Sequence, residues 1–380
     1  MARAGIRLDM MNSGRQSSIA FFLPTLTAGG AERVIMNLAQ GMSERGIRVD
    51  LVVATATGAF LEQIPSTVRL IDLKASRVIS SLVPLIAYLR RERPRALIAS
   101  MSHANVVALW AGRLARSGTP IIATVHTTMS QYGPQQSFVA RRLWPRLLRA
   151  FYPWAARVVA VSRGAADDLA RTTGLARDQI EVVYNPVITP AVLAGARQPL
   201  DHPWFAPGQP PVILGAGRLT AAKDFPTLVR AFAEVRRCRS ARLLILGEGE
   251  ERPRLESLAR ELELNGDFAL PGYSENATAY MARCAVFVLS SAWEGLPTVL
   301  VEALAAGARV VSTDCRSGPR EILGDGHLGA LVPVGDVSSL SAAILAALSQ
   351  GPSATSMESL RLFTRDAAVD HYLQIVEQAQ

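Results

Sequence analysis

The chain has 380 residues, a formal net charge of +8 at pH 7 and 49% hydrophobic residues. This composition excludes a disordered or collagen-like chain, and the length favours two domains over a single core. No run reaches the roughly 18–20 apolar residues that a membrane-spanning helix needs. The three cysteines, Cys238, Cys284 and Cys315, lack metal-ligand spacing and are interpreted as buried thiols of a reducing compartment.

Positive charge is concentrated in the first half of the chain. Residues 1–200 hold 24 Arg and Lys against 11 Asp and Glu (+13), whereas residues 201–380 hold 16 against 21 (−5). An arginine-rich genome would explain why only Lys74 and Lys223 are lysines, but not why the excess lies in one half. The asymmetry predicts an anionic partner for the first half, either a membrane surface or nucleic acid.

Short apolar runs alternate with amphipathic stretches after a polar leader, residues 1–17, that we expect to be disordered. In the first half, strands are expected at residues 19–23, 48–54, 96–101, 121–125, 158–161 and 181–184. In the second half, strands are expected at residues 212–216, 242–246, 268–270, 286–289 and 309–312. Helix-like stretches between them include residues 31–45, 226–236, 252–263 and 298–306. This alternation predicts an α/β protein with parallel, doubly wound sheets.

Seven prolines within residues 186–211 interrupt the alternation. Because proline cannot join a central strand or a helix interior, residues 191–211 are expected to be a Pro-rich linker. The linker would separate an N-terminal domain, residues 18–190, from a C-terminal domain, residues 212–356. Residues 357–380 have a helical pattern, and we expect this helix to pack back on the N-terminal domain.

The most specific motif is Ser-Ser-Ala-Trp-Glu-Gly-Leu-Pro at residues 290–297, between an apolar strand and a helix. The free amides of that helix N-terminus suit a diphosphate at the carboxyl end of the strand. Glu294 can accept hydrogen bonds from sugar hydroxyls, and Glu302 from a ribose diol; the alternative is a solvated helix with two incidental acids. The residues assigned to this donor site are Glu294, Gly295, Leu296, Pro297 and Glu302.

A second motif, Gly-Arg-Leu-Thr-Ala-Ala-Lys-Asp at residues 217–224, directly follows another predicted strand. Small residues leave room for a ligand close to the backbone. Arg218 and Lys223 supply two cations that can neutralise a diphosphate leaving group, a task that a metal performs in other transferases. The alternative for these cations is an ordinary surface pair.

The Glu294-x7-Glu302 spacing and the run from Gly217 to Asp224 closely resemble the retaining GT-B glycosyltransferases of family GT4, of the bacterial envelope-polysaccharide type. Further matches lie at residues 246–249, 270–273 and 317–323 and in the final segment, residues 363–372. The resemblance covers nearly the whole chain. It implies the GT-B fold, two Rossmann-like domains that face each other across a cleft.

The resemblance also implies residue roles. Arg218 and Lys223 would bind the donor diphosphate, Glu294 the hexose and Glu302 the ribose, while His126 would contact the transferred sugar. The predicted catalytic residues are therefore His126, Glu294, Arg218 and Lys223. Further predicted donor contacts are the Gly29 and Gly30 loop against the phosphates, Glu248 in the motif at residues 246–249, and Pro271, Gly272 and Tyr273 around the base.

Polar residues also follow two predicted strands of the N-terminal domain. In an open α/β sheet the ligand lies at the carboxyl ends of the strands. We therefore expect an acceptor site there, although a lone histidine is more often structural. The predicted acceptor-binding residues are Ser102, His103, Asn105 and Thr127.

Arginines alternate with aromatic and aliphatic residues at positions 138–154, a composition typical of an interfacial helix on anionic lipid. Pro145 and Pro153 are expected to break this segment into short pieces. The alternative is an ordinary surface helix with core-facing aromatics. The predicted membrane contacts are Arg141, Arg142, Trp144, Arg146, Arg149 and Trp154.

The expected function is therefore transfer of a hexose, with retention, from a UDP- or GDP-sugar to a lipid-linked, lipopolysaccharide or exopolysaccharide acceptor. We expect no metal, no cofactor besides the nucleotide sugar, no nucleic-acid partner, and a peripheral location on the cytoplasmic face of the cell membrane. The alternatives are a sugar-nucleotide epimerase of the same architecture, a nucleic-acid-binding module and, more distantly, a nicotinamide dehydrogenase.

Overall fold

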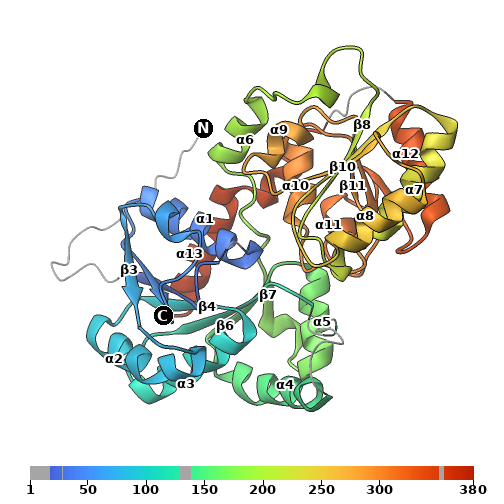
Figure 1. The fold of residues 1–380 in the computed structure, drawn as a ribbon. Coiled ribbons are helices and arrows are strands. Elements are labelled where there is room, and N and C mark those ends of the chain that lie inside the picture. The colour runs from blue at the N-terminus through green and yellow to red at the C-terminus, as the bar shows by residue number, and fades with distance from the viewer. Residues whose placement is uncertain (1–17, 28, 129, 131–137, 351–354) are drawn as a thin grey trace, which may run out of the picture.

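The computed structural model describes residues 18–380 except 28, 129, 131–137 and 351–354. The predicted leader, residues 1–17, therefore lies outside the described residues. Each half of the chain forms one parallel sheet (Figure 1). The first sheet has seven strands in the order β3-β2-β1-β4-β5-β6-β7, and the second has six in the order β10-β9-β8-β11-β12-β13. The predicted pair of doubly wound α/β domains is confirmed.

The strands of the first sheet are β1 (Ile19–Leu23), β2 (Val49–Val53), β3 (Val68–Asp72), β4 (Ala96–Ser100), β5 (Ile121–Val125), β6 (Arg157–Ala160) and β7 (Ile180–Val182). Those of the second are β8 (Val212–Ala216), β9 (Arg242–Leu246), β10 (Phe268–Gly272), β11 (Val286–Leu289), β12 (Val310–Thr313) and β13 (Ala330–Val332). The α-helices are α1 (Gly30–Glu44), α2 (Leu82–Glu92), α3 (Ser102–Ala115), α4 (Phe138–Phe151), α5 (Arg163–Thr173), α6 (Pro190–Arg197), α7 (Phe225–Cys238), α8 (Arg252–Glu261), α9 (Ala277–Met281), α10 (Thr298–Ala305), α11 (Pro319–Ile322), α12 (Val337–Leu348) and α13 (Arg365–Gln378). Short 3-10 turns are η1 (Leu61–Gln63), η2 (Val78–Ser81), η4 (Tyr152–Trp154), η5 (Arg177–Gln179), η6 (Pro203–Phe205), η7 (Ala221–Lys223) and η8 (Glu358–Phe363).

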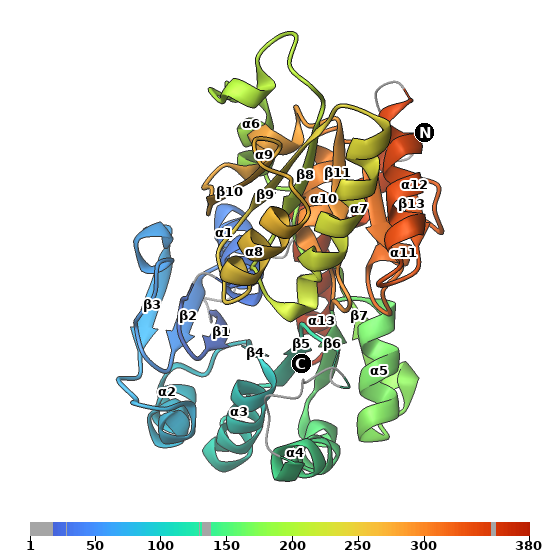
Figure 2. The ribbon, with the colours of Figure 1, turned by 45° about the vertical axis from the view of Figure 1, so that its right-hand side comes forward.

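Helices cover both faces of the first sheet, so its central strands are apolar on both sides. In β1, Phe21 packs into one core cluster with α1 and α13, whereas Phe22 packs into the other with α2, α3 and α4. This alternation follows from the two-residue period of a strand. Figure 2 shows α2, α3 and α4 together on one side of the molecule, remote from the second domain.

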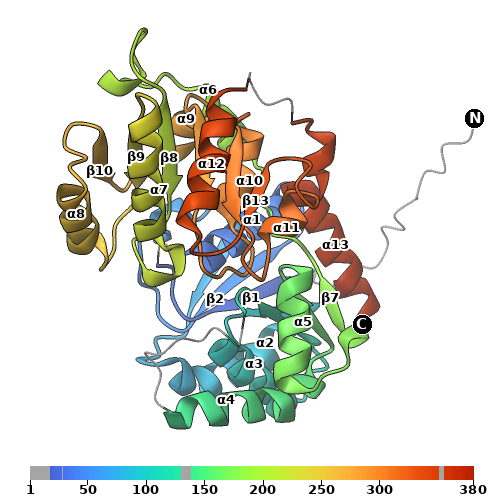
Figure 3. The same cartoon turned by 90° about the vertical axis from the view of Figure 1, so that its right-hand side faces the viewer.

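The chain crosses between the domains twice, and the two crossings are hydrogen-bonded to each other. The amides of Val187 and Ile188 donate to the carbonyl of Phe363 at 3.0 and 2.9 Å, and Arg365 N donates to Ile188 O at 3.0 Å. The rings of Tyr184 and Phe363 lie 5.0 Å apart between their centres. After the second crossing, α13 packs on α1 of the first domain, as Figure 3 shows.

Three predictions about local structure need correction. Helix α6 begins at Pro190 and takes up the first part of the predicted linker, as far as Arg197. It forms because Thr189 caps it and Pro190 occupies a first-turn position where no amide donor is needed. Helix α4 contains Pro145 and continues beyond it to Phe151, so this proline does not divide the segment as expected. Cys238 is exposed, and Cys284 is half-buried; Cys315 alone of the three is fully buried.

Candidate active site

The donor motif forms the loop between β11 and α10, at the carboxyl end of the second sheet. Ser290 and Ser291 are buried where β11 ends, and Ser290 Oγ donates to the carbonyl of Lys223 at 2.8 Å. Ala292 N donates to Ala222 O at 2.8 Å. The loops after β8 and β11 are therefore joined to each other before any ligand binds.

Two glycines let the loop after β8 pack closely on the loop after β9. Gly217 has a φ of 149° and Gly247 a φ of 138°, values that residues with a side chain rarely adopt. A Cβ on Gly247 would lie 1.9 Å from the carbonyl oxygen of Gly217. This close approach fixes the segment that carries Arg218, which is exposed, and Lys223, which is partly buried.

The two motifs meet at an ion pair. Lys223 Nζ lies 2.6 Å from Glu294 Oε1, and Ser291 Oγ donates to the same oxygen at 2.7 Å. The two side chains are only 18% and 13% exposed. Because this pair is largely shielded from water, its attraction is screened less than that of an ordinary surface pair, and it holds both groups at the carboxyl end of the second sheet.

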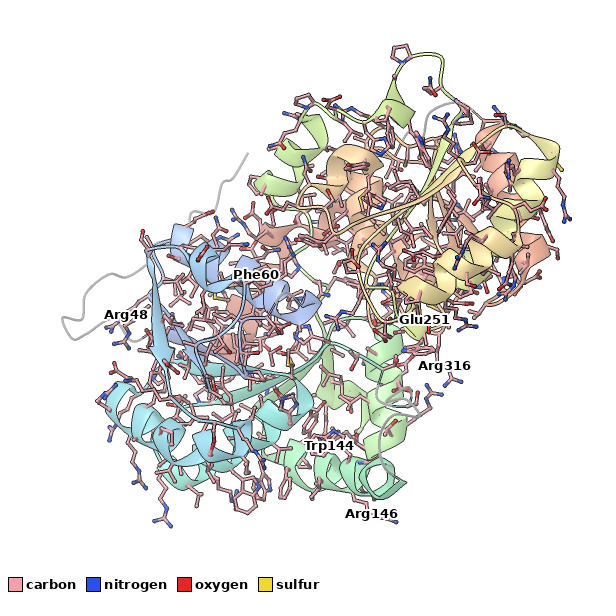
Figure 4. All side chains as sticks on the ribbon, in the orientation of Figure 1. Arg48, Phe60, Trp144, Arg146, Glu251 and Arg316 are labelled. Carbon is pink, nitrogen blue, oxygen red and sulfur yellow. The ribbon has the colours of Figure 1, made fainter. Side chains whose placement is uncertain are left out.

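Glu302 lies on α10 within reach of charges from both domains. Burial raises the pKa of its carboxyl group, and the positive charges of Arg33 and Lys223 oppose that rise. Arg33 comes from the first turn of α1, and its guanidinium lies 5.3 Å from the centre of the Phe60 ring, which Figure 4 labels. Arg33 lies three residues beyond the predicted Gly29-Gly30 phosphate loop and is not among the site residues predicted from the sequence.

His126 follows β5 at the carboxyl edge of the first sheet. Its Nε2 lies 3.1 Å from Thr124 Oγ1, and its Nδ1 is buried with no hydrogen-bond partner in the described part of the chain. Burial lowers the pKa of the imidazole to about 4, so the ring is neutral at pH 7. A neutral ring with one unpaired nitrogen can exchange a hydrogen bond with a sugar hydroxyl.

The loop that carries Glu294 also touches the first domain. A Cβ on Gly295 would lie 2.1 Å from the carbonyl oxygen of His126. Ser162, the N-cap of α5, donates through its hydroxyl to Gly295 O at 2.7 Å and lies 3.0 Å from Ser317 Oγ. These contacts form a buried interdomain seam beside the loop that carries Glu294.

Glu321 completes this seam from α11. Its carboxylate accepts hydrogen bonds from the amides of Arg163 and Gly164 at 2.8 and 2.9 Å and from the hydroxyl of Tyr184 at 3.1 Å. A carboxylate of the second domain therefore caps a helix N-terminus of the first, where the helix dipole favours negative charge. In Figures 2 and 3, α11 lies directly above α5. Residues 317–323 carry part of the family resemblance, but the resemblance implies no role for Glu321.

The predicted acceptor residues divide into exposed and buried ones. His103 and Thr127 are exposed at the ends of β4 and β5, whereas Ser102 is buried in the first turn of α3. Asn105 is wholly buried, and its Nδ2 donates to Thr124 O at 2.9 Å and to Tyr152 Oη at 3.0 Å. The prediction that Asn105 contacts an acceptor is wrong, because its amide joins α3 to β5 inside the domain.

Other predicted donor residues lie around β9 and β10. The Glu248 carboxylate is paired with Arg252 at 2.7 Å and lies against Gly272, whose carbonyl accepts from Gly247 N at 2.8 Å. Pro271 is exposed at the end of β10, and Tyr273 is 65% exposed. These residues form a second, more open group beside the Lys223–Glu294 pair.

The two glycines at the start of α1 differ in the space around them. A Cβ on Gly30 would have nothing within 4 Å, whereas a Cβ on Gly29 would lie 2.3 Å from Glu32 Oε2. Glu32 is buried and accepts from Thr27 Oγ1 at 2.8 Å. The first amides of α1 are thereby presented on exposed backbone. Within the described ranges, no group of three or more His, Cys, Asp or Glu side chains is arranged to hold a metal ion.

The predicted membrane residues lie on or just after α4. Arg146 and Arg149 are exposed, and Trp144 and Trp154 are half-buried. Figure 4 shows Arg146 at the edge of the molecule farthest from the second domain. Arg141 and Arg142 belong to the same helix, but their side chains lie outside the described residues. No helix in the described part of the chain combines the length and the apolar character needed to cross a bilayer.

Solved structures share this two-domain arrangement. HepE from Anabaena, in complex with UDP and glucose, superposes with a TM-score of 0.74 at 21% identity, covering 95% of this chain and 99% of that one. A glycosyltransferase from Rickettsia africae gives a TM-score of 0.78 at 16% identity, covering 96% and 99%. This similarity shows that the fold is GT-B, as predicted.

Sequence relatives and family models agree with the motifs. The lipopolysaccharide core biosynthesis glycosyltransferase LpsE from Rhizobium meliloti is 28% identical over 92% of this chain and 96% of its own. A Campylobacter jejuni diphospho-undecaprenol 4-alpha-N-acetylgalactosaminyltransferase is 28% identical over 85% and 87%. The model for Glycosyltransferase Family 4 matches residues 28–189, and that for Glycosyl transferases group 1 matches residues 197–359. The chain therefore belongs to the GT4, or group 1, glycosyltransferases and is an enzyme of the sugar-transferring class.

Proposed function

We propose that this enzyme transfers a hexose from a UDP- or GDP-sugar, with retention of anomeric configuration and without a metal ion. The observation that carries the proposal is the Lys223–Glu294 pair, held at 2.6 Å where the donor loop meets the neutral His126. A cation for a phosphate and an acceptor for sugar hydroxyls are thereby preassembled at one point. A nucleotide sugar needs both groups at the junction of its phosphate and its hexose.

The donor would exchange partners within this pair. Its diphosphate takes the ammonium of Lys223 together with the guanidinium of Arg218, and a hexose hydroxyl donates to the carboxylate of Glu294. Phosphate oxygens replace the negative charge that Lys223 gives up at Glu294. The Glu294 carboxylate exchanges its cation for hydrogen bonds from the hexose hydroxyl and from Ser291 Oγ. Two fixed cations can stabilise the developing charge of the leaving diphosphate, which is the basis for proposing independence from metal.

In the transfer step, the bond from the anomeric carbon to the phosphate oxygen breaks and a bond to the acceptor oxygen forms on the same face. The acceptor proton passes to the leaving phosphate. His126 would hold the hexose through its unpaired ring nitrogen, and the seam around Gly295 would exclude water. His103 and Thr127, both exposed at the carboxyl edge of the first sheet, would contact the acceptor.

The proposed acceptor is a lipid-linked or envelope polysaccharide. Its support is the kind of protein that resembles this chain, including a transferase named for a diphospho-undecaprenol acceptor and one of lipopolysaccharide core biosynthesis. The basic first half, +13 over residues 1–200, supports a peripheral location on an anionic membrane surface.

The test is thermal stabilisation by UDP, GDP, ADP and NAD, each with and without EDTA. A ligand at 100 times its Kd stabilises the folded state by about 2.7 kcal/mol, which shifts the melting temperature of a domain of this size by several degrees. We expect one nucleoside diphosphate to stabilise the protein, unaffected by EDTA and lost in Glu302→Ala. Stabilisation by NAD alone, or abolished by EDTA, would overturn the proposal.

A second assay separates transfer from epimerisation. The donor named by the first test is incubated with and without a membrane extract that contains acceptors, and both the sugar nucleotide and glycolipid fractions are analysed. Labelled sugar in the glycolipid fraction supports transfer. An altered sugar nucleotide formed without any extract would instead establish the epimerase.

A further inference from the structure

One buried hydroxyl contacts both the main chain of the first sheet and the imidazole of His126. Thr124, on β5, is wholly buried, and its Oγ1 lies 2.9 Å from Ala99 O on the neighbouring strand β4. The same oxygen lies 3.1 Å from His126 Nε2. Figure 2 shows β4 and β5 next to each other below the second domain, with Thr124 paired in register with Ser100.

The carbonyl of Ala99 decides the direction of these hydrogen bonds. A carbonyl oxygen can only accept, so Thr124 donates its single hydroxyl hydrogen to Ala99 O. Towards His126 the Thr124 oxygen then offers only a lone pair, and Nε2 has to be the donor. If Thr124 donated to Nε2 instead, two oxygen atoms would face each other at 2.9 Å with no hydrogen between them.

The other ring nitrogen favours the same assignment. Because burial lowers the pKa of the imidazole to about 4, the ring carries a single hydrogen at pH 7, on either Nδ1 or Nε2. His126 Nδ1 is buried and has no partner among the described residues. A hydrogen on Nδ1 would therefore be a buried donor without an acceptor, which is rare in proteins. A hydrogen on Nε2 satisfies both contacts of Thr124 and leaves Nδ1 with a lone pair.

The main chain around His126 is held by different contacts. A Cβ on Gly295 would lie 2.1 Å from His126 O, and Thr128 Oγ1 donates to Glu294 O at 3.5 Å. These contacts place the backbone of residues 126–128 against the loop that carries Glu294. They leave the hydrogen of the imidazole undetermined, and Thr124 determines it.

We propose that Thr124 is a positioning residue that holds His126 as its Nε2–H tautomer, so that Nδ1 can only accept a hydrogen bond from the donor sugar. This inference rests on the proposed function, in which His126 holds the hexose, and it adds a requirement on that sugar. The group that faces Nδ1 has to donate, as a hydroxyl or the N–H of an acetamido group does. A carboxylate, a methoxy group or a fluorine at that place has no hydrogen to offer and is disfavoured.

The deciding test is an NMR spectrum of the full chain with ¹⁵N-labelled histidine, recorded without ligand at pH 7. The two tautomers differ in the shifts of the ring nitrogens, and the signals of His126 are those missing from His126→Gln. We expect the Nε2–H pattern in the wild type. In Thr124→Val, which keeps the branched shape but lacks the hydroxyl, the two shifts should move towards each other as the tautomers mix. Thr124→Ser should restore the wild-type pattern.

The matched control is Ser100→Ala. Ser100 is also wholly buried and is paired with Thr124 in register, but its Oγ has no partner in the described part of the chain. Removing this hydroxyl should leave the His126 signals unchanged. An Nδ1–H pattern in the wild type, or His126 shifts that are the same in Thr124→Val and the wild type, would overturn the inference.

The requirement on the sugar is tested by titrating UDP-glucose and its analogues with fluorine at C2, C3, C4 or C6, or the GDP-mannose series where GDP is the nucleotide that stabilises. One analogue should bind the wild type about 5-fold or more weakly than its parent, the scale of one hydrogen bond, and should lose little in Thr124→Val. The same loss in both proteins for every analogue would overturn the requirement.

The bare nucleotides keep this result separate from the proposed function. UDP or GDP lacks the hexose, so it should bind Thr124→Val as tightly as the wild type. A wild type that binds neither nucleotide would overturn the proposed function and with it the requirement on the sugar. The tautomer of His126 is measured without any ligand, so the NMR spectrum decides the role of Thr124 in either case.

Discussion

Lys223 and Glu294, which are 71 positions apart in the sequence, form a partly buried ion pair at 2.6 Å on two loops of the second domain. In the proposed complex with the donor, Lys223 would bind a phosphate and Glu294 would accept from sugar hydroxyls, so the ion pair would be replaced. The pair keeps both charges satisfied while the cleft is empty. It also aligns them for a ligand that carries both kinds of group.

Replacing Lys223 with Met should lower kcat/KM by at least about 10²-fold, the scale for one lost electrostatic stabiliser. The same change leaves the Glu294 carboxylate without its cation, so the melting temperature should also fall. Lys223→Met with Glu294→Gln should recover stability but not activity. The control is Lys74→Met, which changes the only other lysine and lies on the exposed end of the first sheet. Activity near normal in Lys223→Met would refute the assigned role.

His126 should act as a neutral group throughout the physiological range. Burial lowers its pKa to about 4, so the unfolded chain, with a pKa near 6.5, binds the proton more strongly. The stability that this residue contributes is therefore complete above pH 6.5 and is lost as the pH falls from 6.5 towards 4. In His126→Gln the melting temperature should depend less on pH between pH 4 and 6.5 than it does in the wild type. In both the wild type and the variant, the pH profile of kcat/KM should show no change of slope near pH 6.5. A change of slope there that is present in the wild type and absent from the variant would contradict a neutral His126.

Asp50 should govern acid stability at lower pH. Desolvation raises its pKa, but hydrogen bonds from Arg69, Tyr88 and Ser18 outweigh this and leave the pKa below its usual value. Its contribution is present above the unfolded pKa near 3.8 and is lost as the pH falls through the still lower folded value. Arg69→Met should cost about 1.5–3 kcal/mol in urea unfolding at pH 7, the range for hydrogen bonds to a charged group, and less at pH 3. An equal loss at both pH values would show that packing, rather than charge, is responsible.

Glu321 should act as a positioning residue through the seam. In Glu321→Ala the amides of Arg163 and Gly164 lose their acceptor, so the first domain is held less firmly against the donor loop. We expect KM for the donor to rise and the share of donor lost to hydrolysis to increase, because water enters a loosened cleft. Glu261→Ala, on the exposed end of α8, is the matched control. A fall in kcat with unchanged KM and hydrolysis would exclude this role.

The sequence predicted most of the fold because central parallel strands are continuous apolar runs. It missed β3 and β13, which are edge strands. In β3, the sequence Val-Arg-Leu-Ile-Asp contains two charged residues and only its first residue is buried, and β13 has three residues. Edge strands lack the two-sided burial that makes a strand conspicuous in a sequence, although the other two edge strands, β7 and β10, are predicted.

The site was only partly predictable for a different reason. The motifs around Lys223 and Glu294 are local, so the sequence identifies them without knowledge of the partner domain. The seam joins Ser162 to Gly295 across 133 positions, and the effect of Arg33 on Glu302 also crosses between domains. The acceptor role predicted for Asn105 is wrong because a polar residue that follows a strand can either face a ligand or join two elements inside the domain, as Asn105 does. Only the three-dimensional arrangement separates these cases.

Gly295 provides the sharpest test of the seam, because its lack of a side chain is what allows the two domains to touch. A Cβ there would lie 2.1 Å from His126 O, and backbone atoms on both sides cannot move aside as a flexible side chain would. Gly295→Ala should therefore push the domains apart at the donor loop while each sheet remains folded. A misplacement of about 1 Å at a reacting centre can cost about 10²-fold in rate, and we expect a loss of that order in kcat/KM.

The matched control for shape alone is Gly30→Ala, since a Cβ at Gly30 would meet nothing within 4 Å. Its rate is not compared, because Gly30 belongs to the predicted donor contacts. Small-angle scattering should show a larger radius of gyration for Gly295→Ala than for Gly30→Ala or the wild type, with unchanged circular dichroism. If Gly295→Ala keeps both the wild-type radius and the wild-type rate, the seam at Gly295 is not required for catalysis. A larger radius with a normal rate would mean that the reaction proceeds without the contact between Gly295 and His126, so that the seam serves stability alone.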